Sequence, residues 1–473
     1  MLFTSFEFLV FFPCVVLGYY IIEKFLGVRL GNCWLLLAGY CFAYNFSPLL
    51  SLLLLIITIL TYCFASLIEK SVDRQSRKRL LAICLLLNFS ALFAFKYYNF
   101  LNESISSLGN LMGMRWVLPR LDILLPIGLS FFSFQTAGYV IDVYRGDLKP
   151  ERNFLTYASF VSFFPVLLAG PIQRANILIP QLKMRKIVTY EHVIPGLKMM
   201  LWGFFMKLCV ADRLGTYVDA VFDNLSQHNG ASVVISSLFY TIQIYGDFGG
   251  YSLIALGCAK VMGFDLPGNF RRPYFSASFK EFWKRWHIAL SSWFRDYLYF
   301  PLGGSRVKYV RYLLNLMIVF AVSGLWHGAS WTFVIWGVIH GLFQIAEALK
   351  KKIGAGDECS SKLMRLFKIL IVFFLVNFAW IFFRADTLAD AFLAIVKIFT
   401  DQGFPFIYPM SMFFGIVSMT ILFLKDFVDE FCPNWKSFSS DNKLISTIGC
   451  SLLAVYILLF GVLDSSQFIY FQF

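Results

Sequence analysis

Three of the five histidines of this 473-residue chain, His287, His327 and His340, lie within one stretch between Ser276 and Glu347. A neutral imidazole accepts a proton from a hydroxyl near neutral pH, which makes histidine the usual general base of enzymes. An ionisable side chain in an apolar segment is costly, so such a residue is a functional candidate by default. We therefore predict acid–base chemistry in this stretch. For His327, a core histidine bonded to a carbonyl group is the alternative, and His340 is interpreted as a satisfied core or tunnel-wall residue.

His327 lies in Ser323-Gly-Leu-Trp-His-Gly-Ala-Ser330, with apolar segments on both sides. Glycine and serine weaken a helix here, and the backbone groups that a break frees survive at membrane depth only where protein or water covers them. We therefore predict that His327 lies at a deep turn between two spans and lines a cavity. Trp326 precedes it, and Asn315 is the other polar group of this pair of spans, so both are candidates for substrate contact.

His287 lies in a charged, tryptophan-rich segment that begins with the S-x-x-E pattern of a capping box at Ser278. At helical spacing, one face of this segment is aromatic and the other is basic, as in helices that lie in the headgroup region. We predict one interfacial helix with His287 at the border of the two faces, and an ordinary surface helix is the alternative. Two further candidate residues for the substrate path are Trp286 and Arg285.

Asp247 lies within an apolar segment, in the sequence Tyr245-Gly-Asp-Phe-Gly-Gly-Tyr-Ser252. A carboxylate there is costly, so we expect it to point into the bundle interior, where it is a candidate for the substrate tunnel. A structural partner for a nearby basic group is the alternative. The ten cysteines are scattered and form no C-x-x-C pair, so we expect neither a metal site nor a disulfide framework.

The composition is that of a polytopic membrane protein. Hydrophobic residues make up 59% of the chain, charged residues 15%, and the mean hydropathy is +0.69, which is too apolar for a soluble domain of this size. The net charge of +13 comes from basic residues in short loops, a pattern typical of cytoplasmic loops rather than of nucleic-acid binding. Placing the basic cluster from Lys70 to Arg79 in the cytoplasm puts the N-terminus outside. The first apolar segment lacks a preceding basic region, which favours a retained span over a signal peptide.

Apolar segments of spanning length predict an all-α bundle of about eleven transmembrane helices with re-entrant and interfacial helices. We expect one integral membrane domain over residues 1–473, with N-terminal spans in 1–150, a catalytic core in 151–350 and C-terminal spans in 363–473. Prolines and glycines between Phe154 and Leu182 forbid one straight helix and predict a half-membrane dip.

The segment Glu281–Gly304, followed by Trp326-His-Gly-Ala329, resembles the membrane-bound O-acyltransferase family. The branch it resembles is the membrane subunit of bacterial alginate O-acetylation, which is related to the D-alanyl transferase of teichoic acids. Where the family often has Asp-Phe-Ser-Gly, this chain has Asp247-Phe-Gly-Gly250. Further segments that carry the resemblance are Pro126–Gln135, Ala169–Arg174, Tyr245–Ser252, Trp380–Ala385 and Phe468–Phe473.

The resemblance implies roles for particular residues. His327 matches the invariant catalytic histidine of the family, and His287 matches the second histidine of this bacterial branch. The implied reaction takes an acetyl group from a cytoplasmic thioester, acetyl-CoA or another acyl thioester, and no bound cofactor is expected. His327 would act as the base, while His287 and Asn315 would orient or polarise the reacting groups. The acceptor would be an extracytoplasmic polysaccharide, reached directly or through a separate extracytoplasmic relay protein.

Two other functions remain open at this point. One is D-alanyl transfer to teichoic acid, although the length and the Phe-Gln-Phe end of the chain favour acetyl transfer. The other is a transporter of a polymer or lipid without acyl transfer, which broken helices and a buried Asp247 also suit, although no internal duplication supports it. We expect a multi-pass protein of the bacterial cytoplasmic (inner) membrane. Alginate, cellulose, peptidoglycan or another glycan each fit as the acceptor.

Overall fold

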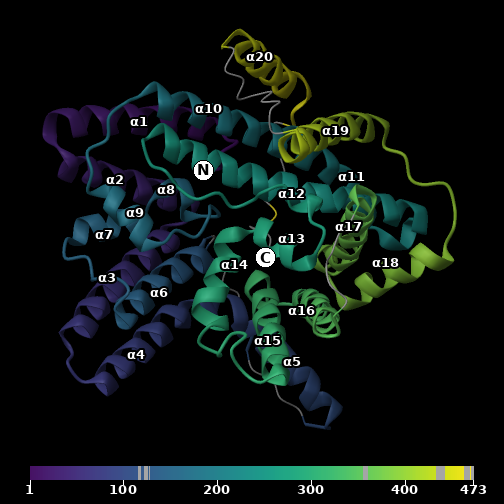
Figure 1. The fold of residues 1–473 in the computed structure, drawn as a ribbon, viewed down its shortest axis with the longest axis horizontal. Helices are drawn as coiled ribbons and strands as arrows, with labels where there is room; N and C mark the ends of the chain where they lie inside the picture. Colours follow the sequence, from purple (N-terminus) through teal and green to yellow (C-terminus); the bar gives the residue numbers. More distant parts are fainter. Residues whose placement is uncertain are drawn as a thin grey trace. The chain divides into compact units, whose positions relative to one another are not determined.

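The computed structural model describes residues 1–114, 119–121, 126, 128–354, 361–432, 443–462 and 469. Every regular element within these ranges is a helix, which confirms the predicted all-α class (Figure 1). Of the predicted family segments, the C-terminal Phe468–Phe473 lies outside the described residues except for Ile469.

The chain divides into two compact units that exchange segments. Unit 1 contains Met1–Gly196 and Ala255–Leu266, and unit 2 contains Leu197–Ile254 and Pro267–Phe473. The helices α10 (Tyr190–Phe204) and α12 (Gly230–Val261) therefore contribute residues to both units. All the histidines of the central stretch belong to unit 2.

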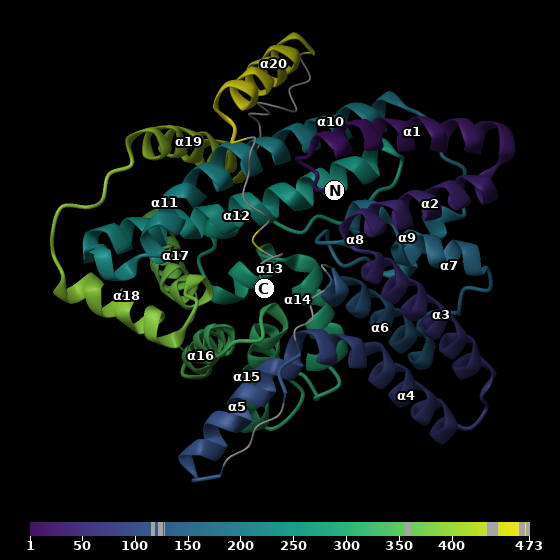
Figure 2. The ribbon, with the colours of Figure 1, turned by 180° about the vertical axis from the view of Figure 1, so that it is seen from behind.

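Unit 1 is a bundle of helices from the first 196 residues, seen from behind in Figure 2. Its elements are α1 (Phe6–Leu26), α2 (Val28–Phe46), α3 (Pro48–Lys70), α4 (Arg74–Leu92), η1 (Phe93–Tyr97), α5 (Tyr98–Leu111), α6 (Leu129–Arg145), α7 (Phe154–Val161), α8 (Phe164–Leu167) and α9 (Ala175–Leu182). Helix α1 packs on α2, and α3 packs on α4 and α6. The segment 154–182 is divided into three short helices, as its prolines predict, while the half-membrane dip stays a prediction.

Unit 2 carries the central histidines and the C-terminal helices. Its further elements are η2 (Phe205–Ala211), α11 (Asp212–Phe222), η3 (Leu225–Gln227), η4 (Pro273–Phe275), α13 (Phe279–Arg285), α14 (Ile288–Phe294), η5 (Arg295–Tyr299), α15 (Tyr309–His327), α16 (Trp331–Lys352), α17 (Lys362–Arg384), α18 (Leu388–Thr400), α19 (Pro409–Phe431) and α20 (Lys443–Phe460). Helices α15 and α16 form an antiparallel hairpin, and α16 also packs on α17.

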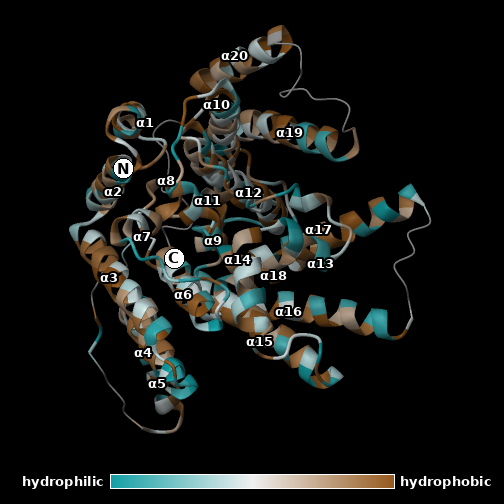
Figure 3. Cartoon of the chain, turned by 60° about the vertical axis from the view of Figure 1, so that its left-hand side comes forward, coloured by the Kyte–Doolittle hydropathy of each residue, from teal (hydrophilic) through white to brown (hydrophobic). Residues whose placement is uncertain are grey.

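Eight helical segments within the described residues are long and apolar enough to cross a membrane. Hydrophobic residues, brown in Figure 3, cover much of these segments. Helix α20 is apolar but shorter. The prediction of about eleven spans also includes α2, α6 and α12, which this criterion of length and composition leaves out. The multi-pass character of the chain is thus clear from the eight alone.

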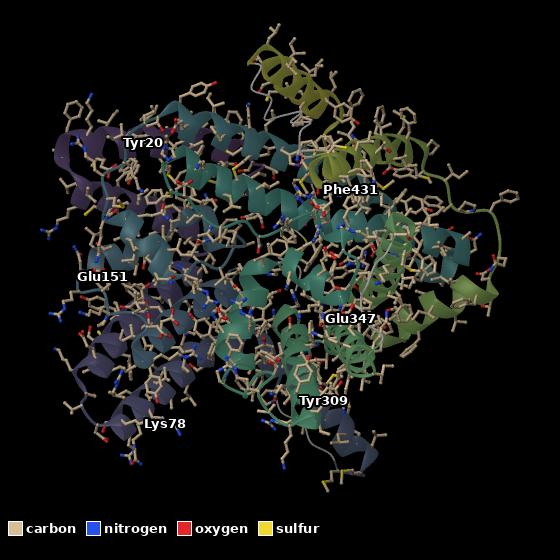
Figure 4. All side chains as sticks on the ribbon, viewed as in Figure 1. Tyr20, Lys78, Glu151, Tyr309, Glu347 and Phe431 are labelled. Carbon is tan, nitrogen blue, oxygen red and sulfur yellow. The ribbon has the colours of Figure 1, made fainter. Side chains whose placement is uncertain are left out.

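The start of α13 shows why a helix begins there. The Ser278 hydroxyl accepts a hydrogen bond from the N–H of Glu281 at 3.0 Å, as the capping-box pattern predicts. The Glu281 carboxylate bonds the N–H of Ala277 at 2.8 Å, one residue before the cap. Glu347 of α16, labelled in Figure 4, accepts from the N–H groups of Phe279 and Lys280 at 2.6 and 3.0 Å. A carboxylate at the positive end of a helix is favourable, so α16 fixes the position of α13.

The prediction of one continuous interfacial helix is wrong. Helix α13 ends at Arg285, and α14 begins at Ile288 after His287, which has a left-handed backbone with φ of +44°. The N–H of Ile288 donates to the carbonyl of Asn269 at 2.9 Å instead of to the preceding helical turn. The helix therefore breaks because another segment of the chain captures its backbone.

Glycines set the distance between α15 and α16. A Cβ atom on Gly324 would overlap the carbonyl oxygen of Phe333 and lie 3.2 Å from the Cα of Gly337. A Cβ atom on Gly337 would in turn overlap the carbonyl oxygen of Phe320. Gly324 and Gly337, which each begin a G-x-x-x-G pattern in the sequence, thus mark direct backbone contact, the packing that small residues permit between membrane helices.

We predict that Gly324→Ala separates the two helices and lowers the free energy of unfolding by about 1–3 kcal/mol, as overpacking does. The measurement is the thermal unfolding midpoint of the purified protein in detergent. Gly449→Ala in α20 is the matched control, because no atom lies within 4 Å of its Cβ position. Equal midpoints for wild type and Gly324→Ala would contradict the close contact.

Candidate active site

His287 is held at the junction of α13 and α14, fully buried. Its Nδ1 lies 3.2 Å from the Oδ1 of Asn269. The rings of Phe248 and Phe270 contact it, with centroids at 4.6 and 6.3 Å. Burial lowers the pKa of the His287 imidazole to about 3, so the side chain is neutral at physiological pH.

His327 is the last residue of α15, and 3% of it is exposed. The rings of Trp326, Trp336 and Phe383 surround it, with centroids at 5.0, 5.0 and 5.4 Å. The predicted turn is present, because Gly328–Ser330 separates α15 from α16. The cavity beside His327 stays a prediction, and the close rings mean that a substrate reaches the imidazole only when they move.

The structure brings His287 and His327 together, although 40 positions separate them in the sequence. Their ring centroids are 6.3 Å apart, and the Trp326 ring lies 6.1 Å from that of His287. The imidazoles of His287 and His327 and the indole of Trp326 thus lie together, buried among aromatic side chains of unit 2. Such a site suits proton transfer, because a neutral imidazole accepts a proton without competition from water.

Trp286 and Arg285 contribute to this region in different ways. Trp286 is fully buried and packs against Phe270 and Trp380, with centroids at 5.0 and 5.1 Å. The Arg285 guanidinium is paired with the carboxylates of Glu281 and Glu430 at 2.6 and 2.8 Å. Trp286 therefore supports the ring of Phe270, which in turn contacts His287. The charge of Arg285 is thus neutralised by carboxylates of the protein itself. Its ion pair with Glu430 links α13 to α19.

Asn315 is not brought to the histidines. It lies three helical turns before His327 on α15, about 18 Å along the helix axis at 1.5 Å per residue. Its amide donates to the carbonyl groups of Leu302 and Gly304, both at 3.1 Å. These bonds hold the loop that follows η5 against α15. The geometry therefore gives Asn315 a structural task.

Asp247 belongs to a buried ion cluster. The ammonium of Lys207 lies 2.7 Å from both Asp247 and Asp212, and all three side chains are at most 5% exposed. Asp247 also accepts a hydrogen bond from the N–H of Ile469 at 2.7 Å, which links Ile469 to α12. This geometry supports the alternative raised from the sequence, in which Asp247 is the partner of a basic group.

We predict unequal effects when this cluster is changed. Lys207→Met leaves two buried carboxylates unpaired and lowers the free energy of unfolding by about 3–5 kcal/mol. Asp247→Asn leaves a neutral Lys207–Asp212 pair and keeps an acceptor for Ile469, so its cost is about 1 kcal/mol. Chemical or thermal unfolding of both purified variants measures the difference. A severe loss with Asp247→Asn and a mild one with Lys207→Met would refute the assigned pairing.

Sequence reasoning missed several residues that surround the two histidines. Phe248 and Phe383 lie within segments that carry the family resemblance, so those segments were a usable signal. Asn269 sits alone in the loop after α12, and nothing in its local sequence marks it. His340 is fully buried among the rings of Trp283 and Trp336, with centroids at 5.1 and 4.9 Å, and is thus a residue of the aromatic wall.

The fold and the site together define a polytopic helical membrane enzyme with a buried pair of histidines. The family model of the membrane-bound O-acyltransferases (MBOAT) matches residues 148–355. The chain is 37% identical over 393 residues, 83% of its length, to the probable alginate O-acetylase AlgI of Pseudomonas aeruginosa, of which it covers 73%. It therefore belongs to the membrane-bound O-acyltransferase family, and it is an O-acyltransferase.

Two other relatives show how the similarity is distributed. The peptidoglycan O-acetyltransferase of Helicobacter pylori is 34% identical over 416 residues, which cover 82% of this chain and 77% of that protein. The teichoic acid D-alanyltransferase of Bacillus subtilis is 26% identical over 223 residues, which cover 45% of this chain and 56% of that protein. The similarity to proteins named as acetyl transferases is thus both higher and longer.

Proposed function

We propose that the protein transfers an acetyl group from a cytoplasmic thioester, acetyl-CoA, for the O-acetylation of an extracytoplasmic polysaccharide in the bacterial cytoplasmic membrane. The observation that carries this proposal is the buried pair of His327 and His287, with ring centroids 6.3 Å apart, at the end of α15. Acyl transfer to an alcohol needs a base that takes the hydroxyl proton, and a neutral imidazole is suited to that task.

In the proposed reaction, His327 accepts the proton of the acceptor hydroxyl. The hydroxyl oxygen attacks the thioester carbonyl carbon, a C–O bond forms and the C–S bond breaks. The proton on His327 then passes to the departing sulfur, so the imidazole is neutral again and the products are an ester and a thiol. His287 supports His327 in this step. Exclusion of water by the surrounding rings protects the thioester from hydrolysis.

Charge on the surface of unit 2 supports an anionic donor. Exposed basic residues lie before, within and after the segment that contains α13, α14 and η5. Their positive charge attracts the phosphates of a coenzyme A head. Arg285 is not among them, because two carboxylates neutralise it. The exposed basic residues are Arg271, Lys280, Lys284, Arg306, Lys308 and Arg311, while Arg295 is exposed but pairs with the Asp296 carboxylate at 2.8 Å.

The choice of an acetyl group over a D-alanyl group rests on how much of the chain each kind of relative matches. The O-acetylase of Pseudomonas aeruginosa and the O-acetyltransferase of Helicobacter pylori match more than four fifths of the chain, while the D-alanyltransferase of Bacillus subtilis matches less than half. Their names point to alginate and to peptidoglycan, so a glycan hydroxyl is the proposed acceptor class. We also propose a separate extracytoplasmic relay or transferase protein, because the acetyl group has to reach a polymer outside the membrane.

We predict that His327→Gln lowers acetyl transfer by about 10²–10⁴-fold, the contribution of a general base, while the protein stays folded. The measurement is transfer of labelled acetyl groups from acetyl-CoA to glycan by membranes from cells that produce the polymer and the variant. His228→Gln, in the turn after η3, is the control for loss of a histidine.

The same assay tests the donor. Acetyl-CoA should support transfer, whereas a D-alanyl thioester should not. Full activity of His327→Gln would defeat the assigned base, and transfer from the D-alanyl thioester alone would defeat the assigned donor. An unfolding midpoint equal to that of wild type shows that any lost activity is not lost folding.

A further inference from the structure

Asn269 contacts the ring of His287 and the two residues that follow it. The residue is 1% exposed and lies in the loop between α12 and η4. Its carbonyl oxygen accepts from the N–H of Ile288 at 2.9 Å, and its side-chain Oδ1 accepts from the N–H of Ala289 at 3.2 Å. These bonds hold the first residues of α14 and thereby the left-handed backbone of His287. A left-handed non-glycine residue is strained and persists only where its surroundings impose it.

The network fixes which way the amide of Asn269 points. A backbone N–H only donates, so the atom that faces Ala289 has to be the oxygen of the amide. The amide nitrogen correspondingly donates to the hydroxyl of Ser252 at 3.2 Å. The reverse orientation would set the N–H groups of Asn269 and Ala289 against each other. The buried amide is thus assigned by its partners.

The orientation of the amide determines the tautomer of His287. The Oδ1 of Asn269 is an acceptor with two lone pairs, and the Nδ1 of His287 lies 3.2 Å from it. Nδ1 therefore carries the proton and donates. In a neutral ring the second nitrogen, Nε2, is then unprotonated and can only accept. Within the described part of the chain, Nε2 is buried without a hydrogen-bond partner.

We infer that Asn269 is a positioning residue that holds His287 in its Nδ1–H tautomer, so that Nε2 serves the reaction as a hydrogen-bond acceptor. This inference rests on the proposed function and narrows it. His287 cannot polarise the thioester carbonyl through Nε2, because that nitrogen has no proton to donate. It instead accepts from the N–H on the other ring nitrogen of His327, which becomes a charged donor once His327 has taken the hydroxyl proton, and a hydrogen bond to a charged donor is a strong one.

The surroundings of His287 leave it free of fixed charge. The rings that contact it belong to Phe248, Phe270, Trp326 and His327, so His327 is the titratable group that faces it. Burial keeps the pKa of His287 low, at about 3. The acceptor nitrogen is thus available across the physiological pH range, and protonation of His287 would remove it.

A spectroscopic experiment tests the tautomer without any need for activity. The full protein is labelled with ¹⁵N-histidine, and His287→Gln identifies the signals of residue 287. We expect wild type to show a protonated Nδ1 and an unprotonated Nε2. Asn269→Ala should show both tautomers, and Ser252→Ala should retain the wild-type tautomer because Ala289 still orients the amide. A protonated Nε2 in wild type would overturn the inference.

A pH profile tests what the tautomer does. Asn269→Asp keeps the acceptor oxygen but adds a negative charge beside Nδ1, which raises the pKa of His287 by about one to three units. We expect this variant to lose acetyl transfer as the pH falls through the raised pKa and to recover it at higher pH. Asn269→Ala should lower transfer by about tenfold at every pH.

The outcomes separate a positioning role from a merely structural one. If Asn269 only stabilises the loop, the Asp and Ala variants lose activity by similar factors at every pH, and the inference fails. If wild type transfers no acetyl group but shows the expected tautomer, the proposed function fails while the assignment of Asn269 stands. Unfolding midpoints of both variants identify any loss that comes from misfolding.

Discussion

The contact between the backbones of Gly324 and Gly337 is the constraint from which the site is built. Two membrane helices that approach this closely leave no room for a side chain at the crossing. Because α15 and α16 are locked there, the turn that joins them is locked as well, and His327 sits at its start. The ring of Phe333 fills the space beside Gly328, so a side chain at Gly328 would overlap that ring. The catalytic candidate is thus positioned by residues that have no chemistry of their own.

A second constraint brings His287 to that turn. The segment around Asn269 runs beside the junction of α13 and α14, where the N–H of Arg271 donates to the carbonyl of Arg285 at 2.9 Å. Both non-glycine residues with positive φ in the described chain, Arg272 and His287, flank this pairing. Two strained residues in one short region indicate that the surroundings determine the backbone, and functional sites concentrate such strain. The break between α13 and α14 allows the imidazole of His287 to be buried next to the end of α15.

Much of the fold was predictable because lipid allows few alternatives. Apolar length marks the helices, proline breaks 154–182, and the serine cap starts α13 at the expected residue. The break at His287 was not predictable, since it depends on Asn269, 18 positions earlier in the sequence. Local sequence patterns indicate which secondary structure a segment prefers. This break instead results from hydrogen bonds to a segment that is distant in the sequence. The partners of Asp247 could not be predicted either, because Lys207 and Ile469 come from other parts of the chain.

The enclosure of His327 by aromatic rings has a consequence for the proposed reaction. Two bulky substrates cannot meet an imidazole that is 3% exposed unless some of the surrounding rings turn away. Trp336 packs against Trp380 and Phe383 at 5.5 and 5.1 Å, so its movement would disturb several contacts at once. Trp326, two residues before Gly328, packs against the rings of His287 and His327, with centroids at 6.1 and 5.0 Å. The same rings that have to move would keep water from the proposed thioester once both substrates are in place, so enclosure favours acyl transfer over hydrolysis.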